Sequence, residues 1–195
     1  MNDNRTFFGF RRVSSDEKTS LVKNVFSSVS ENYDLMNDLM SGGLHRLWKK
    51  ELMGYIPDFS GKLLDMASGT GDIAISYYKT AKKLGLMPSI TACDASPEML
   101  DVGKRKATDK GILDINYQVS FAEKLPFETG SFDYYTVVFG IRNFTDIEES
   151  LKEAYRVLKP GGKFICMEFS KIQNRLLEPF YDLYSMYLIP QIGKI

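Results

Sequence analysis

Residues Lys62–Ile73 read K-L-L-D-M-A-S-G-T-G-D-I: a short apolar run ends in an acid, passes through a turn with two glycines and opens a helix. In an open α/β sheet, such a turn after the first strand builds a nucleotide pocket. Asp65 and Asp72 would repel a pyrophosphate but favour a ligand with a cationic amine and a sulfonium. Ala74 replaces the third glycine of G-x-G-x-x-G. The stretch predicts a loop for S-adenosylmethionine (SAM), with a NAD loop as the alternative.

The composition predicts one intracellular α/β domain. The 195 residues are 44% hydrophobic, enough to bury a full core. The 25 basic and 25 acidic residues cancel, which argues against nucleic acid as a partner or substrate. No apolar stretch suits export or a membrane span, so we expect a cytoplasmic protein. Cys93 and Cys166 fall in apolar runs, which predicts two buried free thiols. We expect no metal site.

Two parts are predicted along the chain. Residues 1–60 form an N-terminal helical cap or lid, in which Ser14 and Glu17 make a capping box and two short helices are broken at Gly42-Gly43. Residues 61–195 form a Rossmann-like SAM-binding domain, with a mostly parallel sheet and helices on both faces. The predicted strands are 62–67, 89–94, 115–120, 132–139 and 162–169. The predicted helices are 71–83, 97–108, 147–158 and 174–188.

The cofactor is expected across the ends of the first three strands. Asp94 ends the second strand, where an acid accepts hydrogen bonds from both ribose hydroxyls. After the third strand, Phe121 can stack on the adenine and the backbone of Ala122 can bond the base edge. The alternatives are that Asp94 is a plain loop acid and that Phe121 only packs the turn.

Arg142 and Asn143 follow the fourth strand in G-I-R-N-F-T-D. This places them at the carboxyl edge of the sheet, beside the reactive end of the cofactor. We expect a role in catalysis or substrate binding, with a loop brace or helix cap as the alternative.

Several runs together resemble the UbiE-type ubiquinone/menaquinone C-methyltransferases. They are Y-D-L-M-N-D, L-D-M-A-S-G-T-G-D-I-A, G-I-R-N-F-T-D, Y-R-V-L-K-P-G-G-K-F and M-E-F-S-K, and the resemblance extends from about Phe8 to Gly193. It implies SAM-dependent C-methylation of a polyprenylated benzoquinol or of demethylmenaquinol. Two positions depart from the common bacterial pattern: Phe121 stands where an Asn is frequent, and Val138 where a Ser is frequent. The cofactor site expected from motif and resemblance is Gly69, Thr70, Gly71, Asp94, Ala95, Phe121 and Ala122.

A ring carbon is nucleophilic only when a neighbouring hydroxyl is at least partly ionised. Arg142 stays charged near neutrality and suits stabilisation of a phenolate. Asn143 and Tyr33 are candidates to orient the quinol oxygens. His45, the one histidine, is a weaker candidate for a base, because a lone histidine in a helix–turn segment more often serves packing.

Other readings remain open. The protein can be a class I methyltransferase for another small molecule, or a non-catalytic SAM-fold subunit. Besides a prenylated quinol, the expected partners are a second copy of the chain and, peripherally, the inner membrane or a quinone-biosynthesis complex. Methyltransferases of this fold usually close the sheet with an antiparallel hairpin, and the resembling family continues past I-P-Q-I-G. We therefore expect a truncated form in which this hairpin is missing.

Overall fold

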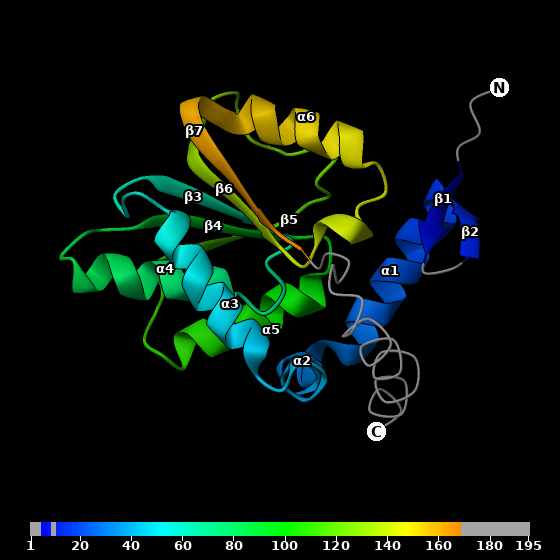
Figure 1. The fold of residues 1–195 in the computed structure, drawn as a ribbon, viewed down its shortest axis with the longest axis horizontal. Coiled ribbons are helices and arrows are strands. Elements are labelled where there is room, and N and C mark those ends of the chain that lie inside the picture. The colour runs from blue at the N-terminus through cyan, green and yellow to red at the C-terminus, as the bar shows by residue number, and fades with distance from the viewer. Residues whose placement is uncertain (1–4, 9–10, 169–195) are drawn as a thin grey trace, which may run out of the picture.

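The computed structural model describes residues 5–8 and 11–168 of the 195. Five parallel strands form one sheet in the order β5-β4-β3-β6-β7 (Figure 1). The strands are β3 (Lys62–Met66), β4 (Ser89–Asp94), β5 (Ile115–Val119), β6 (Phe132–Val138) and β7 (Leu158–Met167). The chain runs outward from β3 to β5 and then returns to β6, so the strand order reverses between β3 and β6. In such sheets, ligands bind at the carboxyl ends of the strands beside this reversal.

Helices cover both faces of the sheet, as the sequence predicts. In Figure 1, α4 (Asp72–Lys83) and α5 (Pro97–Thr108) lie on one face and α6 (Ile147–Val157) on the other. The central strand is apolar on both sides for this reason. Leu63 packs into the core beneath α4 and α5, and its neighbour Leu64 packs into the core on the α6 side.

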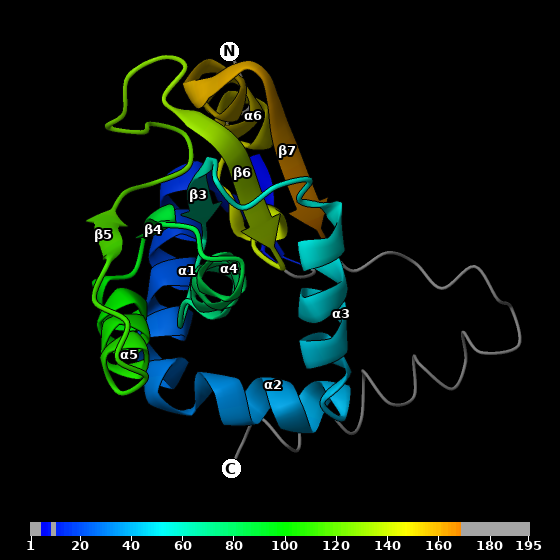
Figure 2. The same ribbon diagram turned by 90° about the vertical axis from the view of Figure 1, so that its left-hand side faces the viewer.

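The N-terminal part contains α1 (Ser15–Val29), α2 (Tyr33–Ser41) and α3 (Leu44–Leu52). A turn of 3₁₀ helix, Ser30–Asn32, joins α1 to α2. Figure 2 shows these three helices on three sides of α4. Ser14 is confirmed as the N-cap of α1, since its hydroxyl accepts a hydrogen bond from the Glu17 N–H at 3.2 Å, which is one of the two bonds of the predicted capping box. The break between α2 and α3 is also confirmed, with Gly42 and Gly43 both in the left-handed region.

Three findings differ from the sequence predictions or add to them. A two-stranded hairpin, β1 (Arg5–Phe8) with β2 (Arg11–Ser14), precedes α1 and was not expected. Cys93 is buried, but the prediction of a buried thiol at Cys166 is wrong, because β7 has a partner on one side only among the described strands and Cys166 is exposed. The strand predicted at 162–169 begins earlier, at Leu158. The helix predicted at 174–188 lies outside the described residues.

A buried carboxylate joins the centre of the sheet to the start of α4. Asp65 is 1% exposed, and its two oxygens accept hydrogen bonds from the Thr136 hydroxyl on β6 at 2.8 Å and from the Ala74 N–H on α4 at 3.2 Å. Burial raises the pKa of Asp65 to about 7, against the lowering effect of these two donors. The side chain thus holds β3, β6 and the helix after the glycine turn in one arrangement.

The raised pKa of Asp65 makes a prediction about stability and pH. In the unfolded chain an aspartate titrates near 3.9, so between that pH and about 7 unfolding releases a proton. The contribution of Asp65 to stability is therefore complete below this window and falls as the pH rises through it. Asp65→Asn cannot titrate, so its free energy of unfolding should fall less steeply with pH. Urea denaturation across the window measures both slopes, and equal slopes would contradict the raised pKa.

Candidate functional site

A cavity lies at the carboxyl ends of the strands, on both sides of the reversal between β3 and β6. Its volume is about 750 Å³ when the part open to solvent is included. Residues from β3, β4, β5 and β6, or from the loops that follow them, form one wall, and α1 and α2 form the other. The cavity therefore opens between the sheet and the N-terminal helices.

The glycine turn and the acid that ends β4 meet inside this cavity. Asp94 accepts hydrogen bonds from the backbone N–H of Gly69 at 2.8 Å and of Ser96 at 2.9 Å. Burial raises the pKa of Asp94, while the N–H groups of Ser96, Gly69 and Ala95 act against this rise. Gly69 has φ +54°, and a Cβ on it would lie 3.3 Å from the terminal methyl of Met99. A larger residue at position 69 would therefore narrow the cavity.

The cavity contains most of the cofactor residues predicted from the sequence. Gly69, Asp94, Ala95, Phe121 and Ala122 all line it. Phe121 is half-exposed, which leaves its ring face available to a ligand, whereas Ala122 is buried. These five residues come from the ends of three neighbouring strands, as expected for a nucleoside site.

Thr70 and Gly71 do not line the cavity. The Thr70 hydroxyl donates a hydrogen bond to Asp34 of α2 at 2.7 Å, so the side chain connects the glycine turn to the N-terminal helices. Gly71, at φ +77°, turns the chain into α4. That these two residues bind the cofactor stays a prediction, and it now concerns their backbone groups rather than a side chain.

The acids of the glycine turn are paired with protein groups. Asp72 binds Lys49 of α3 at 2.7 Å and also binds Lys106 of α5, which in turn binds Asp34. Burial alone would raise the pKa of Asp72, but the two lysines outweigh it and lower the pKa to about 2. Because Asp65 is also bonded within the protein, neither acid faces the cavity. The expectation that these acids attract a cationic ligand directly is therefore not met, and the acids instead shape the loop.

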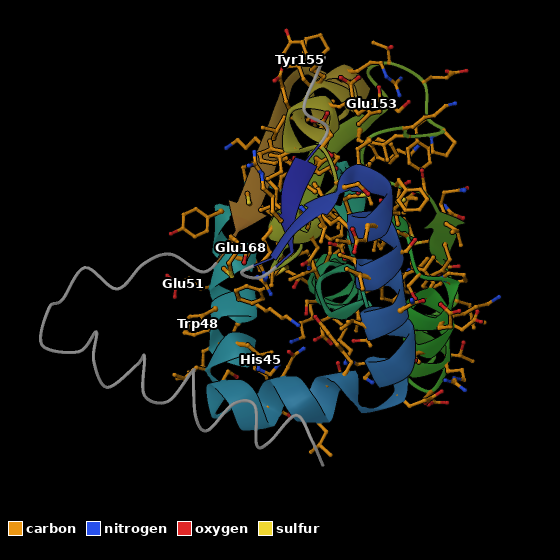
Figure 3. The ribbon with its side chains drawn as sticks, turned by 90° about the vertical axis from the view of Figure 1, so that its right-hand side faces the viewer. His45, Trp48, Glu51, Glu153, Tyr155 and Glu168 are labelled. Atoms are coloured by element: carbon orange, nitrogen blue, oxygen red, sulfur yellow. The ribbon has the colours of Figure 1, made fainter. Side chains whose placement is uncertain are left out.

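The residues predicted for chemistry divide into two groups. Tyr33, the first residue of α2, and Asn143, after β6, line the cavity. Arg142 does not: its half-exposed guanidinium forms an ion pair with Glu168, just after β7. His45 is 5% exposed within α3, where its Nδ1 lies 2.8 Å from the Ser41 hydroxyl (Figure 3). This position matches the packing alternative for His45.

The wall formed by α1 was not predicted from the sequence. Thr19 and Val22 line the cavity, and the Thr19 hydroxyl lies 2.8 Å from that of Thr145 in the loop after β6. The residue before Thr19, Lys18, donates a hydrogen bond from its ammonium to the Phe144 carbonyl at 2.6 Å. These contacts join residues more than a hundred positions apart, and no local pattern signals them.

Gly140 sets the distance between the loops after β3 and β6. A Cβ added to it would lie 2.5 Å from the Cβ of Ala67, which is itself held at φ +52°. We expect Gly140→Ala to lower the free energy of unfolding by about 1–3 kcal/mol, since a clash in a packed region forces the backbone to move. Gly54→Ala is the control, because no atom lies within 4 Å of its added Cβ. Chemical denaturation measures both, and an equal effect of the two variants would contradict the close approach.

The parallel sheet, the glycine turn and the cavity beside the reversal define the Rossmann-like fold of class I methyltransferases. The YcgJ protein of Bacillus subtilis is similar in structure, with a TM-score of 0.55 and 26% identity over 72% of this chain and 56% of that chain. A SAM-dependent methyltransferase of Thermotoga maritima has a TM-score of 0.61 over 87% of this chain and 72% of its own, but its 22% identity supports the fold alone.

The model of the ubiE/COQ5 methyltransferase family matches residues 12–195. A relative from Rickettsia bellii, named ubiquinone/menaquinone biosynthesis C-methyltransferase UbiE, is 54% identical over 193 residues. The match covers 98% of this chain and 78% of the relative. The chain belongs to the ubiE/COQ5 methyltransferase family, which confirms the resemblance found in its motifs.

Proposed function

We propose that the protein transfers a methyl group from SAM to a ring carbon of a polyprenylated benzoquinol or of demethylmenaquinol. One observation supports this most strongly. A single cavity holds the predicted nucleoside residues, among them Asp94 and Phe121, together with Tyr33 and Asn143, which come from the family-specific runs Y-D-L-M-N-D and G-I-R-N-F-T-D. Cofactor and substrate groups are therefore close enough to share one reaction site.

The residues present fit SAM. Ser68, which lies between the lining residues Ala67 and Gly69 but does not itself line the cavity, has a buried hydroxyl without a hydrogen-bond partner among the described residues. A buried hydroxyl of this kind costs free energy unless a ligand or water satisfies it. Asp94 would hold the ribose, Phe121 would cover the adenine, and the backbone of Gly69 would receive the methionine end. SAM supplies an electrophilic methyl on a sulfonium when it is bound.

The residues of the chain have two tasks on the substrate side. Tyr33 and Asn143 present polar groups inside the cavity and would orient the quinol oxygens, which keeps the ring carbon in line with the methyl. Arg142 would stabilise the phenolate that makes this carbon nucleophilic. Its guanidinium is bound to Glu168, so it would have to donate to the substrate oxygen and to this carboxylate together, or leave the carboxylate. The apolar side chains of Val138 and Phe139 line the same region and suit a hydrophobic ring.

The cofactor role of Asp94 is testable by calorimetry. Asp94→Ala should weaken SAM binding roughly tenfold or more, about 1.4 kcal/mol, because a hydrogen bond to a charged group is lost. Because Asp94 also holds the N–H groups of Gly69 and Ser96, thermal denaturation must show that the variant is folded. Unchanged SAM affinity in a folded variant, or tight NAD binding by the parent protein, would refute the assignment.

The role of Arg142 predicts a separation of turnover from binding. Arg142→Ala should lower kcat by at least about tenfold, the effect of a lost charge-assisted contact, with little change in SAM affinity. Arg105→Ala is a matched control, because Arg105 is also an exposed arginine that forms an ion pair with a carboxylate, that of Glu31. Loss of SAM affinity with normal turnover at saturation would instead assign Arg142 to the cofactor.

The substrate class is tested directly with SAM and a short-chain demethylated quinol. Methyl transfer to a ring carbon supports the proposal. Transfer to other small molecules but not to quinols would favour a different methyltransferase, and SAM binding without any transfer would favour a non-catalytic subunit.

A further inference from the structure

The loop that carries Asn143 consists of one 3₁₀ turn, Ile141–Asn143, and the residues that lead from it to α6. Asn143, Phe144 and Thr145 all line the cavity. The geometry of this loop therefore decides where the Asn143 amide lies on the substrate side of the cavity, and the groups that hold the loop bear directly on the proposed reaction.

Glu123 holds this loop from the turn after β5. One oxygen of its carboxylate, Oε1, accepts hydrogen bonds from the backbone N–H groups of Thr145 at 2.7 Å and of Asp146 at 3.1 Å. Hydrogen bonds to an ionised acceptor are stronger than those between neutral groups. Glu123 directly follows Phe121 and Ala122, and all three residues line the cavity. One carboxylate thus links the turn predicted to receive the adenine with the loop predicted to bind the quinol.

A group from α1 holds the same loop at the preceding residue. The Lys18 ammonium donates a hydrogen bond to the Phe144 carbonyl at 2.6 Å, and Lys18 is only 5% exposed. Burial lowers the pKa of Lys18, and the negative charge of Glu123 opposes this lowering. A cation and an anion therefore hold three consecutive backbone units of the loop, each through the backbone group that suits its charge.

We propose that Glu123 is a positioning residue for methyl transfer, which ties the loop of Asn143 to the turn of Phe121 and Ala122. SAM bound at this turn would then order the loop, and the Asn143 amide would be in place for a quinol oxygen. The inference rests on the proposed function, because it assigns Phe121 to the cofactor and Asn143 to the substrate. Glu123 acts through Asn143 and not on the reacting atoms.

A carboxylate that only stabilises the fold can make the same kind of bond. Asp133 is the example in this chain, because its Oδ2 accepts the N–H of Lys62 at 2.7 Å near the amino end of β6, and neither residue lines the cavity. Glu123 differs in that both of the segments it joins contribute to the cavity wall. The two roles are therefore separable by their effect on turnover.

Amide hydrogen exchange with and without SAM tests the link and needs no quinol. In Glu123→Ala, the amides of Thr145 and Asp146 should exchange at least about tenfold faster than in the parent, because they lose a charged acceptor. The Leu125 amide is an internal control, since it donates to a different carboxylate, that of Glu153, at 2.7 Å. SAM should slow exchange of the two loop amides in the parent but not in Glu123→Ala. Loop amides that do not respond to SAM in the parent would overturn the proposal.

Turnover separates positioning from plain stabilisation of the fold. The assay uses SAM and a short-chain demethylated quinol without lipid; no helix among the described residues is long and apolar enough to cross a membrane. Glu123→Ala should lower kcat at least about tenfold, with a much smaller change in SAM affinity, because a small misplacement of an orienting group is costly. Glu123→Gln keeps Oε1 as an acceptor for both N–H groups and should recover most of this loss.

Asp133→Ala is the matched control for these variants. It removes a carboxylate that accepts a backbone N–H outside the cavity, so it should lower the free energy of unfolding and keep the parental kcat. Equal losses of kcat in Glu123→Ala and Asp133→Ala would overturn the proposal. Equal losses in Glu123→Ala and Glu123→Gln would also overturn it, because the two hydrogen bonds are its basis.

A double-mutant cycle with Asn143 tests the route of the effect. If Glu123 acts through Asn143, Glu123→Ala should lower kcat far less in an Asn143→Ala background than in the parent. Losses that multiply independently would overturn the proposal. If the parent methylates no quinol, the proposed function fails, but hydrogen exchange at the loop amides still decides whether Glu123 ties the loop to the cofactor turn.

Discussion

The hydrogen bonds of the buried Asp65 carboxylate hold together the part of the fold on which the site depends. They join the central strand to Thr136 on β6 and to the Ala74 N–H at the start of α4. The glycine turn lies between these anchored points, so its left-handed residues are held in a fixed arrangement. Any other geometry of the turn would leave a buried polar group without its hydrogen bond, which costs free energy. The observed geometry is therefore favoured. Asp94 acts in a similar way, because its carboxylate accepts hydrogen bonds from the N–H groups of Gly69 and Ser96 and so fixes the backbone beside the cavity.

A second set of charges connects the site to the N-terminal helices. Asp34 of α2 binds Thr70 and Lys106, and Asp72 binds Lys106 and Lys49 of α3. The carboxylates of Asp34 and Asp72 therefore do not attract a ligand. They attach the N-terminal helices to the glycine turn. As a result, Tyr33 of α2 lines the cavity and Trp48 of α3 packs against Phe139. The proposed cofactor and substrate sides of the cavity thus share one set of connections.

The strand ends divide the cavity by the residue types that line it. The ends of β3, β4 and β5 and the loops after them provide a glycine turn, an acid and an aromatic ring, which are the groups that we propose to bind the nucleoside of SAM. Residues after β6 provide Asn143 and apolar side chains, which suit a quinol ring. The change from one set of residue types to the other occurs at the reversal of strand order between β3 and β6, where two neighbouring loops diverge and leave space for a ligand.

The amino-acid sequence by itself determined the alternation of strands and helices, the two short helices around Gly42-Gly43, the family, and the positions of Gly69, Asp94 and Phe121 at strand ends. These features follow from local patterns of hydrophobicity, capping and turn residues. Only the tertiary structure decided that Asp65 and Asp72 bond to protein groups, that Arg142 pairs with Glu168, and that α1 forms a wall through Thr19. The exposure of Cys166 on β7, the last strand in the order of the described sheet, was decided in the same way. Such contacts depend on which distant segments pack together, and no spacing within one segment encodes them.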